Sequence, residues 1–229
     1  YIPCLGVYTD PASSPMNIGG RVNFGQQPFT YTPPAGFKAL STKNLPDPLI
    51  ANPKLYFDTL LYTGTGAAQS ITGAEFQPDL AWIKVRSAVD SNAVFDATRG
   101  AGYRLQTNDT GAEALRADVL SSFDGTGFSI SGSDQQSNAD GEDYAAWLWK
   151  EGVIPGCDIV AYTGDGVAGR TVAHGLGDAP AMMIVKKRSG VDFWRVYHSA
   201  LGATKFLSLS ETNAQGTAST VWNNTEPSS

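Results

Sequence analysis

The stretch FDTLLYTGTG at residues 57–66 decides the fold, because it recurs as CDIVAYTGDG at residues 157–166. Farther along the chain, KVRS at residues 84–87 matches KKRS at residues 186–189, so the spacing grows from 100 to 102 residues. Three more matches keep the spacing of 102: Pro78 with Pro180, Leu105 with Leu207, and Val119 with Val221. Self-similarity at a fixed spacing indicates a repeated structural unit.

The repeat predicts the domain organisation. We expect a first part at residues 1–50, a linker at 51–56, a first repeat at 57–150, a second linker at 151–156 and a second repeat at 157–229. The second repeat is incomplete, because nothing in it matches residues 123–150. Three explanations stay open: the sequence is part of a longer chain, the remainder does not fold, or a partner chain completes the repeat.

Short alternating runs separated by glycine-rich turns predict β-strands. In AWIKVRS at residues 81–87, Ile83 and Val85 share one face, and Trp82, Lys84 and Arg86 share the other. Further strands are expected within residues 127–131, 144–150, 181–189, 192–198 and 204–210. The fold class is therefore all-β, with tandem antiparallel β-sandwich modules of the concanavalin-like or jelly-roll type. One helix is expected at residues 110–120, and any helix in its counterpart at 211–222 should be short.

The composition narrows the class of protein. The 229 residues include 25 glycines and 13 prolines, and charged residues make up 17%, below the roughly 25% of an average soluble domain. A net charge of −6 without a basic stripe argues against nucleic acid as a partner. No stretch reaches the roughly 20 apolar residues of a membrane span. Cys4 and Cys157 are either two free thiols or one long-range disulfide, and His174 and His198 have no second ligand at zinc spacing.

The sequence also carries a family resemblance. VNFGQQPFTYTPPAGFKALSTKNLP at residues 22–46 resembles the C-terminal part of a SPRY-type module, a concanavalin-like β-sandwich. The repeats that follow are similar to modules found after such segments in bacteriophage structural proteins. The shared elements are YTG at 162–164, HGLG at 174–177 with Pro180, KKRS at 186–189, and WRVYH at 194–198.

This resemblance implies a non-enzymatic component of a phage virion, located on the particle surface. The expected role is a tail-fibre or surface-attached module for host attachment. Its expected partners are other virion proteins, a host cell-surface glycan and further copies of the chain, three of them if it forms a fibre. An extracellular carbohydrate-binding or polysaccharide-depolymerising protein and a capsid decoration protein are the alternatives. No cofactor, nucleic acid or membrane insertion is expected.

Six features are candidates for chemistry, and none of them identifies catalytic, cofactor-binding, metal-binding or ligand-binding residues. GDGVAG at residues 164–169 has dinucleotide-site spacing but is followed by no helical pattern, which favours a hairpin. His174 is expected to cap a turn. The acidic segment at 133–143 only faintly fits a calcium loop and is expected to be a solvated hairpin loop.

Three of these six features could act at the surface. The pair Asp90 and Asp96 could serve glycoside hydrolysis, but its counterparts in the second repeat are not both acidic. The loop at residues 97–104, with Arg99, Tyr103 and Arg104, is the most ligand-like segment. Trp147 and Trp149 should share one face of their strand, opposite Tyr144, Ala146 and Leu148. Most tryptophans, including Trp82, Trp194 and Trp222, are expected in the core, although one or two at a sheet surface could stack on sugar rings.

Overall fold

A computed structural model describes residues 27–29, 32, 34–36, 38 and 45–229. The chain divides into two compact units, residues 1–48 and 49–229. Cys4 and most of the SPRY-like segment at 22–46 lie outside the described residues. The account below therefore concerns the second unit.

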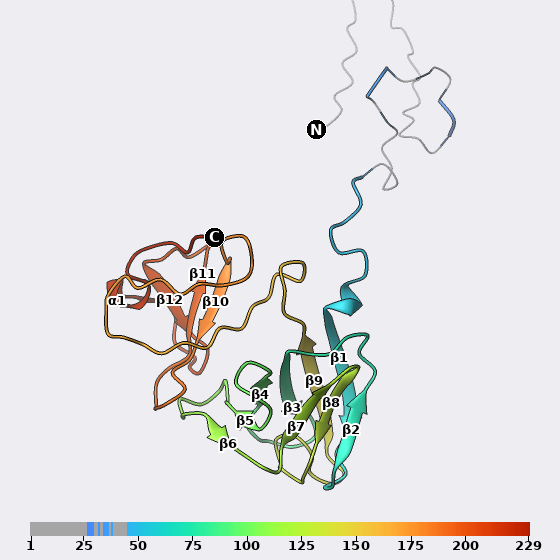
Figure 1. Cartoon of the computed structure of the whole chain (residues 1–229), viewed down its shortest axis with the longest axis vertical. Coiled ribbons are helices and arrows are strands. Elements are labelled where there is room, and N and C mark those ends of the chain that lie inside the picture. Colours follow the sequence, from blue (N-terminus) through green and yellow to red (C-terminus); the bar gives the residue numbers. More distant parts are fainter. Residues whose placement is uncertain (1–26, 30–31, 33, 37, 39–44) are drawn as a thin grey trace, which may run out of the picture. The chain divides into compact units, whose positions relative to one another are not determined.

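The prediction of an all-β fold is confirmed, because antiparallel sheets dominate the described residues (Figure 1). A four-stranded sheet has the order β1 (Phe57–Thr63), β9 (Asp143–Trp149), β3 (Leu80–Val85), β4 (Ala93–Asp96). A three-stranded sheet has the order β2 (Gln69–Thr72), β8 (Gly127–Ile130), β7 (Leu120–Asp124), and a small sheet pairs β5 (Tyr103–Arg104) with β6 (Ala114–Leu115). A 3-10 helix, η2 (Pro53–Leu55), precedes β1, and Asn52 caps it.

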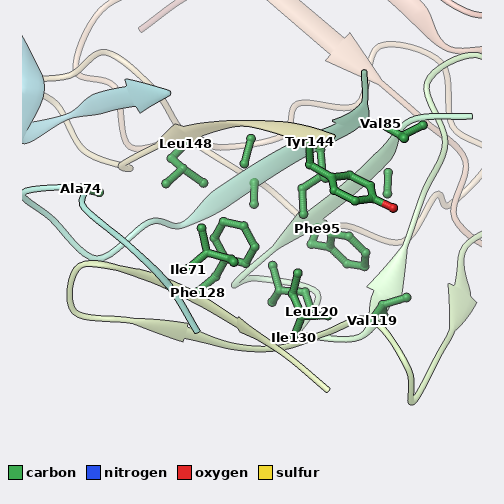
Figure 2. Close-up of a cluster of buried hydrophobic side chains, with 14 of the residues drawn as sticks. Ile71, Ala74, Val85, Phe95, Val119, Leu120, Phe128, Ile130, Tyr144 and Leu148 are labelled. Carbon is green, nitrogen blue, oxygen red and sulfur yellow. The ribbon is translucent and has the colours of Figure 1, made fainter. Parts of the chain in front are cut away.

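The core lies between the four-stranded and three-stranded sheets. Alternation places Ala81, Ile83 and Val85 of β3 on the inner face, as predicted, and all three are buried. Figure 2 shows Phe128 and Ile130 of the three-stranded sheet pointing toward the side chains of the four-stranded sheet. The cluster joins these members: Ile71, Ala74, Phe76, Phe95, Val119, Leu120, Tyr144, Ala146 and Leu148. This packing of two apolar faces makes residues 57–149 a β-sandwich.

A second set of strands follows in the order β10 (Met182–Val185), β11 (Arg195–His198), β12 (Lys205–Ser208), β13 (Gly216–Thr217). Its pairings repeat those of the first set at a spacing of 102. Leu80 pairs with Asp96, and Met182 pairs with His198. Tyr103 pairs with Leu115, and Lys205 pairs with Thr217 in the same way. The two sets therefore share one pairing scheme, whereas the domain boundaries set out above stay a prediction.

The second set has no strand that corresponds to β1. Residues 157–163, which copy the sequence of β1, are extended chain without strand pairing apart from one bridge, Gly152 with Cys157. In the first set β1 pairs with β9 over its whole length. Residues 157–163 therefore lack, among the described residues, a neighbouring strand of the kind that β9 provides for β1.

The predicted helix at residues 110–120 is wrong. Ala114 and Leu115 form β6, and Leu120 begins β7. An isolated helix of this length is marginal in water, and tertiary contacts decide the outcome here. The counterpart region holds α1 (Ser219–Trp222), a single turn, as its weaker helical pattern suggested.

The two strand sets meet at a polar junction. The indole Nε1 of Trp194 donates to the carbonyl oxygens of Gln106 (2.9 Å) and Asp109 (3.1 Å). Arg188 pairs with Glu113 through its side chain at 2.9 Å, and the backbone nitrogen of Glu113 donates to the Arg188 carbonyl. The Trp194 ring is buried, so these bonds fix the second set against the loop after β5.

Candidate functional site

The outer face of the four-stranded sheet carries aromatic side chains, and we call Phe57, Leu61, Trp82, Trp147 and Trp149 the aromatic face. Strand register brings them together, because Trp147 stands beside Trp82 on one flank and Trp149 stands beside Phe57 on the other. All five point away from the core, since the inner positions of β9 are Tyr144, Ala146 and Leu148.

The side chains of the aromatic face are open to solvent to different degrees. Leu61 is 63% exposed and Phe57 41% exposed, and the three tryptophans are half-buried. The rings of Phe57 and Trp149 lie 5.0 Å apart between centroids, at 59°. The expectation that most tryptophans lie in the core is therefore wrong for Trp82, Trp147 and Trp149. Solvent-facing indoles offer flat apolar platforms with a hydrogen-bond donor at one edge.

A shallow groove lies on the three-stranded sheet. Its volume is about 410 Å³, and its lining is Ala68, Gln69, Ser70, Ser121, Ser129, Ile130 and Ser131. The Ser70 and Ser129 hydroxyls lie 2.8 Å apart, and Ser129 also donates to Asp124 at 2.6 Å. Hydroxyl and amide groups in this hollow can exchange hydrogen bonds with a polar ligand.

The acidic segment at 133–143 is not the solvated hairpin loop that was expected. Asn138 is fully buried, and its amide group donates to the carbonyl oxygens of Ala67 and Gly132, both at 2.6 Å. The Asn138 side-chain oxygen accepts from Thr65 N (3.0 Å) and Gln69 Nε2 (2.5 Å). The loop is thus fastened to the turn after β1 through one amide side chain.

The aromatic rings beneath this loop reinforce it. Tyr62 and Tyr144 stack at 5.1 Å, and the Tyr62 hydroxyl donates to the carbonyl of Ser137 at 2.7 Å. Burial raises the pKa of the Tyr62 hydroxyl well above its ordinary value. The backbone of Gly64 lies very close to the loop, because a Cβ atom at Gly64 would be 2.1 Å from the Ala139 carbonyl oxygen. The Tyr62-Thr63-Gly64 element therefore packs against the loop at 131–142.

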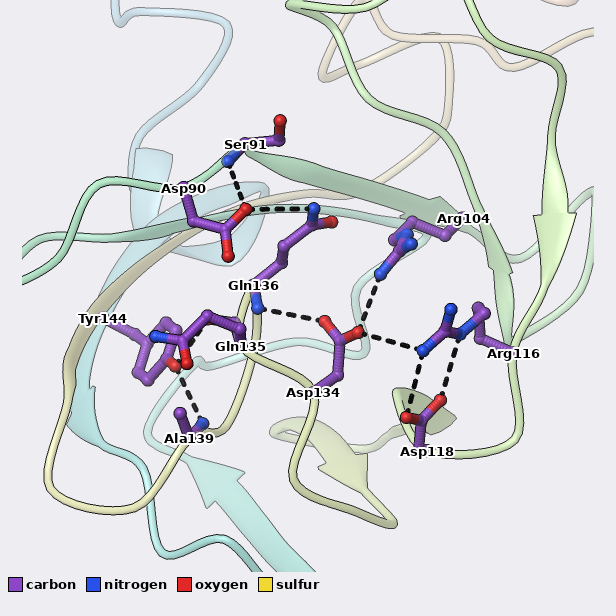
Figure 3. Close-up of polar contacts among 10 residues, drawn as sticks. All are labelled: Asp90, Ser91, Arg104, Arg116, Asp118, Asp134, Gln135, Gln136, Ala139 and Tyr144. Carbon is purple, nitrogen blue, oxygen red and sulfur yellow. Dashed lines mark hydrogen bonds and ion pairs between the residues drawn. The ribbon is translucent and has the colours of Figure 1, made fainter.

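The Asp134 carboxylate of this segment is bound by two arginines. Figure 3 shows Asp134 between Arg104, at 2.8 Å, and Arg116, at 3.5 Å. The side chain of Asp134 is almost buried, and that of Arg116 is exposed and pairs also with Asp118. Among residues 45–229 and the few described before them, no three His, Cys, Asp or Glu side chains form a group that could hold a metal ion.

Both arginines of the loop at residues 97–104 form ion pairs and have little exposed side-chain surface. The Arg99 side chain is buried and bonds Asp96 at 2.5 Å and the Val94 carbonyl at 3.1 Å. The Arg104 side chain forms the ion pair with Asp134 that is described above. Asp96 is thus an ion-pair partner, while Asp90 accepts from Gln136 at 3.3 Å. The structure does not bring Asp90 and Asp96 together as a pair with shared contacts.

The remaining motifs have structural surroundings. Residues 164–169 contain a bend and a turn but are flanked in sequence by no strands, so the expected hairpin is wrong there. His174 accepts from the backbone nitrogen of Leu176 at 3.3 Å, a contact within a turn, and His198 ends β11. Cys157 forms no disulfide with another described residue, and burial raises the pKa of its thiol.

Comparison with known proteins gives the family. A family model described as "Domain of unknown function (DUF7483)" matches residues 52–229. The chain belongs to this family. No curated protein and no solved structure matches it. No helix among the residues described for this DUF7483 chain is long and apolar enough to cross a membrane.

In the DUF7483 chain, the sequence signal for the aromatic face was the alternation in β9. Trp147 and Trp149 share one face opposite Tyr144, Ala146 and Leu148, as predicted. The addition of Phe57 and Trp82 depends on which strands flank β9, and strand order does not follow from local alternation. The sequence did not point to Asn138, because three of its four hydrogen-bond partners lie about 70 residues away.

Alkaline pH should destabilise the DUF7483 chain through Tyr197, whose hydroxyl donates to Glu226. Burial, together with this carboxylate, raises the pKa of Tyr197 to about 12 from an ordinary 10.0. The folded-state pKa exceeds the unfolded one, so the contribution is complete below pH 10 and is lost as pH rises through about 12.

Melting temperatures measured from pH 8 to 12 should therefore fall less steeply for Tyr197→Phe than for the wild type. Other buried tyrosines, Tyr62 among them, lower the melting temperature of both proteins equally at high pH, so their effects cancel in the comparison. Equal slopes for the two proteins would show that Tyr197 is not held in this way.

Proposed function

We propose that this chain is a structural and adhesive module of a bacteriophage virion, displayed on the particle surface as part of a tail fibre or a surface-attached protein. The observation that carries the adhesive role is the aromatic face. Its half-buried Trp147 and Trp149 stand on a sheet rather than on loops, so the platform is rigid. The resemblance of residues 157–198 to phage structural modules supports the virion assignment.

The chemistry of the aromatic face fits a host glycan. Indole rings stack on the apolar faces of sugar rings, and Nε1 donors at their edges can bond sugar hydroxyls. Trp82, Trp147 and Trp149 lie on adjacent strands, which suits a ligand of more than one sugar unit. The polar junction at Trp194 and Glu113 supports the structural part of the proposal, because it joins serial strand sets into one body.

Glycan binding should depend on the central indole. Replacing Trp147 with serine removes a stacking surface, and we expect a loss of about 2 kcal/mol, roughly thirtyfold in Kd. The matched variant Trp147→Phe keeps a ring and should lose far less. Binding is measured on a glycan array of host surface polysaccharides and then by calorimetry. No signal from the wild-type chain on any glycan would remove the adhesive role.

A test of the virion assignment is independent of the ligand. Purified particles of a phage that encodes the chain should contain it by mass spectrometry, and antibody labelling in the electron microscope should place it on the tail. Labelling of the head would favour a capsid decoration protein instead. Its absence from particles would refute the virion assignment. Sedimentation of the purified protein tests the proposed trimer, since fibres are commonly built of three chains.

The serine-lined groove favours a second candidate, a carbohydrate-binding protein that reads its ligand by hydrogen bonds. Ser70 and Ser121 are exposed in this groove, so Ser70→Trp should fill it without disturbing the core. If Ser70→Trp abolishes glycan binding and Trp147→Ser does not, the groove is the site and the aromatic face is not. Release of oligosaccharide from a host polysaccharide would further identify a depolymerase.

A further inference from the structure

The aromatic face continues into two cationic positions on the same side of the sheet. Lys84 and Arg86 follow Trp82 at every second residue, and the ladder extends to Arg86, whose backbone nitrogen donates to the Asp143 carbonyl at 2.7 Å. The Asp143 carboxylate accepts from the Thr63 hydroxyl at 3.0 Å. Two residues along a strand span about 7 Å, so Lys84 stands within reach of a ligand that stacks on the Trp82 indole.

The Lys84 ammonium is held in place and keeps donors for a ligand. It donates to the backbone carbonyl of Asp90 at 2.6 Å, and an ammonium has three N–H donors. The Asp90 carboxylate accepts instead from Ser91 N at 2.6 Å and from Gln136 Nε2 at 3.3 Å (Figure 3). Within the part of the chain that the structure describes, no Asp or Glu forms an ion pair with Lys84 or Arg86.

The second strand set uses the equivalent cations for contacts within the protein. Lys186, which matches Lys84 at the spacing of 102, donates to three backbone carbonyl oxygens at 3.0, 3.0 and 3.5 Å. Arg188, which matches Arg86, pairs with Glu113 at 2.9 Å. The two cations therefore fasten the protein in the second set, whereas in the first set they stand beside indoles without a charged partner.

We infer that the ligand of the aromatic face is an acidic glycan, whose anionic group binds Lys84 while its sugar rings stack on Trp82 and Trp147. This inference rests on the proposed glycan-binding role and adds the class of ligand. Carboxylate, phosphate and sulfate groups share the charged oxygen that an ammonium binds, and the exposed Arg86 adds attraction for the same group. The whole chain carries a net charge of −6, so it does not attract polyanions without such a site.

An array tests the inference with glycans that carry carboxylate, phosphate or sulfate groups, each beside the same glycan with that group esterified or removed. We expect an acidic glycan to bind the full chain about tenfold more tightly than its neutral counterpart, and added salt to weaken only the former. The group whose removal weakens binding identifies the anion. Lys84→Gln should weaken binding of the acidic glycan about tenfold and leave that of the neutral one within about twofold. Lys84→Arg keeps the charge and should bind the acidic glycan nearly as the wild type does.

The matched control is Lys187→Gln, which removes the same charge from an exposed lysine of the second strand set and should leave binding within about twofold. Equal or stronger binding of the neutral glycans would overturn the inference and leave the adhesive role standing. Equal weakening by Lys187→Gln and Lys84→Gln would do the same, and so would equal weakening by Lys84→Arg and Lys84→Gln, which would mark Lys84 as a support of its loop. Absence of binding to any glycan would remove the adhesive role itself, and the inference with it.

Discussion

Replacing Asn138 with alanine should lower the free energy of unfolding by about 4 kcal/mol, because the variant loses four side-chain hydrogen bonds worth about 1 kcal/mol each. Asn138 is fully buried, so water does not replace its bonds to Thr65, Gln69, Ala67 and Gly132. The carbonyl oxygens of Ala67 and Gly132 would stay buried but would lose the hydrogen-bond donor that the Asn138 amide provides. Urea unfolding followed by circular dichroism measures the change.

Two variants sharpen the Asn138 prediction. Asn138→Asp keeps an acceptor for Thr65 and Gln69 but turns an oxygen toward the carbonyls of Ala67 and Gly132, so it should destabilise at least as much at neutral pH. Asn108→Ala, at an exposed position, should change stability by less than about 0.5 kcal/mol. A loss below about 1 kcal/mol for Asn138→Ala would show that the loop is not fastened by this side chain.

Replacing Phe128 with alanine should cost about 3–5 kcal/mol, the range for removing a buried aromatic side chain. Phe128 has no exposed surface and lies between the two sheets, where its ring meets that of Tyr62 edge-on at 6.0 Å. Figure 2 shows it beside Ile71, which pairs with it across β2 and β8. The cavity left by the ring adds to the lost burial, so the sandwich loses contact in its middle.

The control for Phe128 is Leu115→Ala on β6. Leu115 is largely exposed, and its truncation should change stability by less than about 0.5 kcal/mol. Thermal unfolding of both variants checks the pair, with the larger loss expected only for Phe128. Similar small losses in the two variants would mean that the two sheets are not packed as a sandwich.

The fold class was predictable because it depends on local alternation. Ile83 and Val85 of β3 face the core as their spacing required, and Trp147 and Trp149 share the outer face of β9. The repeat of Tyr-Thr-Gly also gave the spacing at which the strand pairings of the two sets recur. What the alternation could not supply was the identity of the neighbouring strands, and the degree of burial depends on those neighbours.

The errors share a physical cause, which is long-range contact. The helix expected at 110–120 gave way because Ala114 and Leu115 pair with β5. Arg99 reads as a surface residue in sequence, yet Asp96 and the Val94 carbonyl hold it inside the protein. The same holds for the candidate site. The sequence predicts that Trp147 and Trp149 share one face of β9, but it does not predict that Phe57 and Trp82 lie beside them on the neighbouring strands.

The central structural claim is that β10 repeats β3 with one edge open, and amide hydrogen exchange measured by NMR tests it most directly. Every second amide of an edge strand points away from its only partner. We therefore expect slow exchange throughout residues 81–83 of β3, which pair on both sides, and slow exchange only at alternate residues of β10, Met182–Val185. Uniform protection of β10, or no protection in β10 and β11, would contradict the claim.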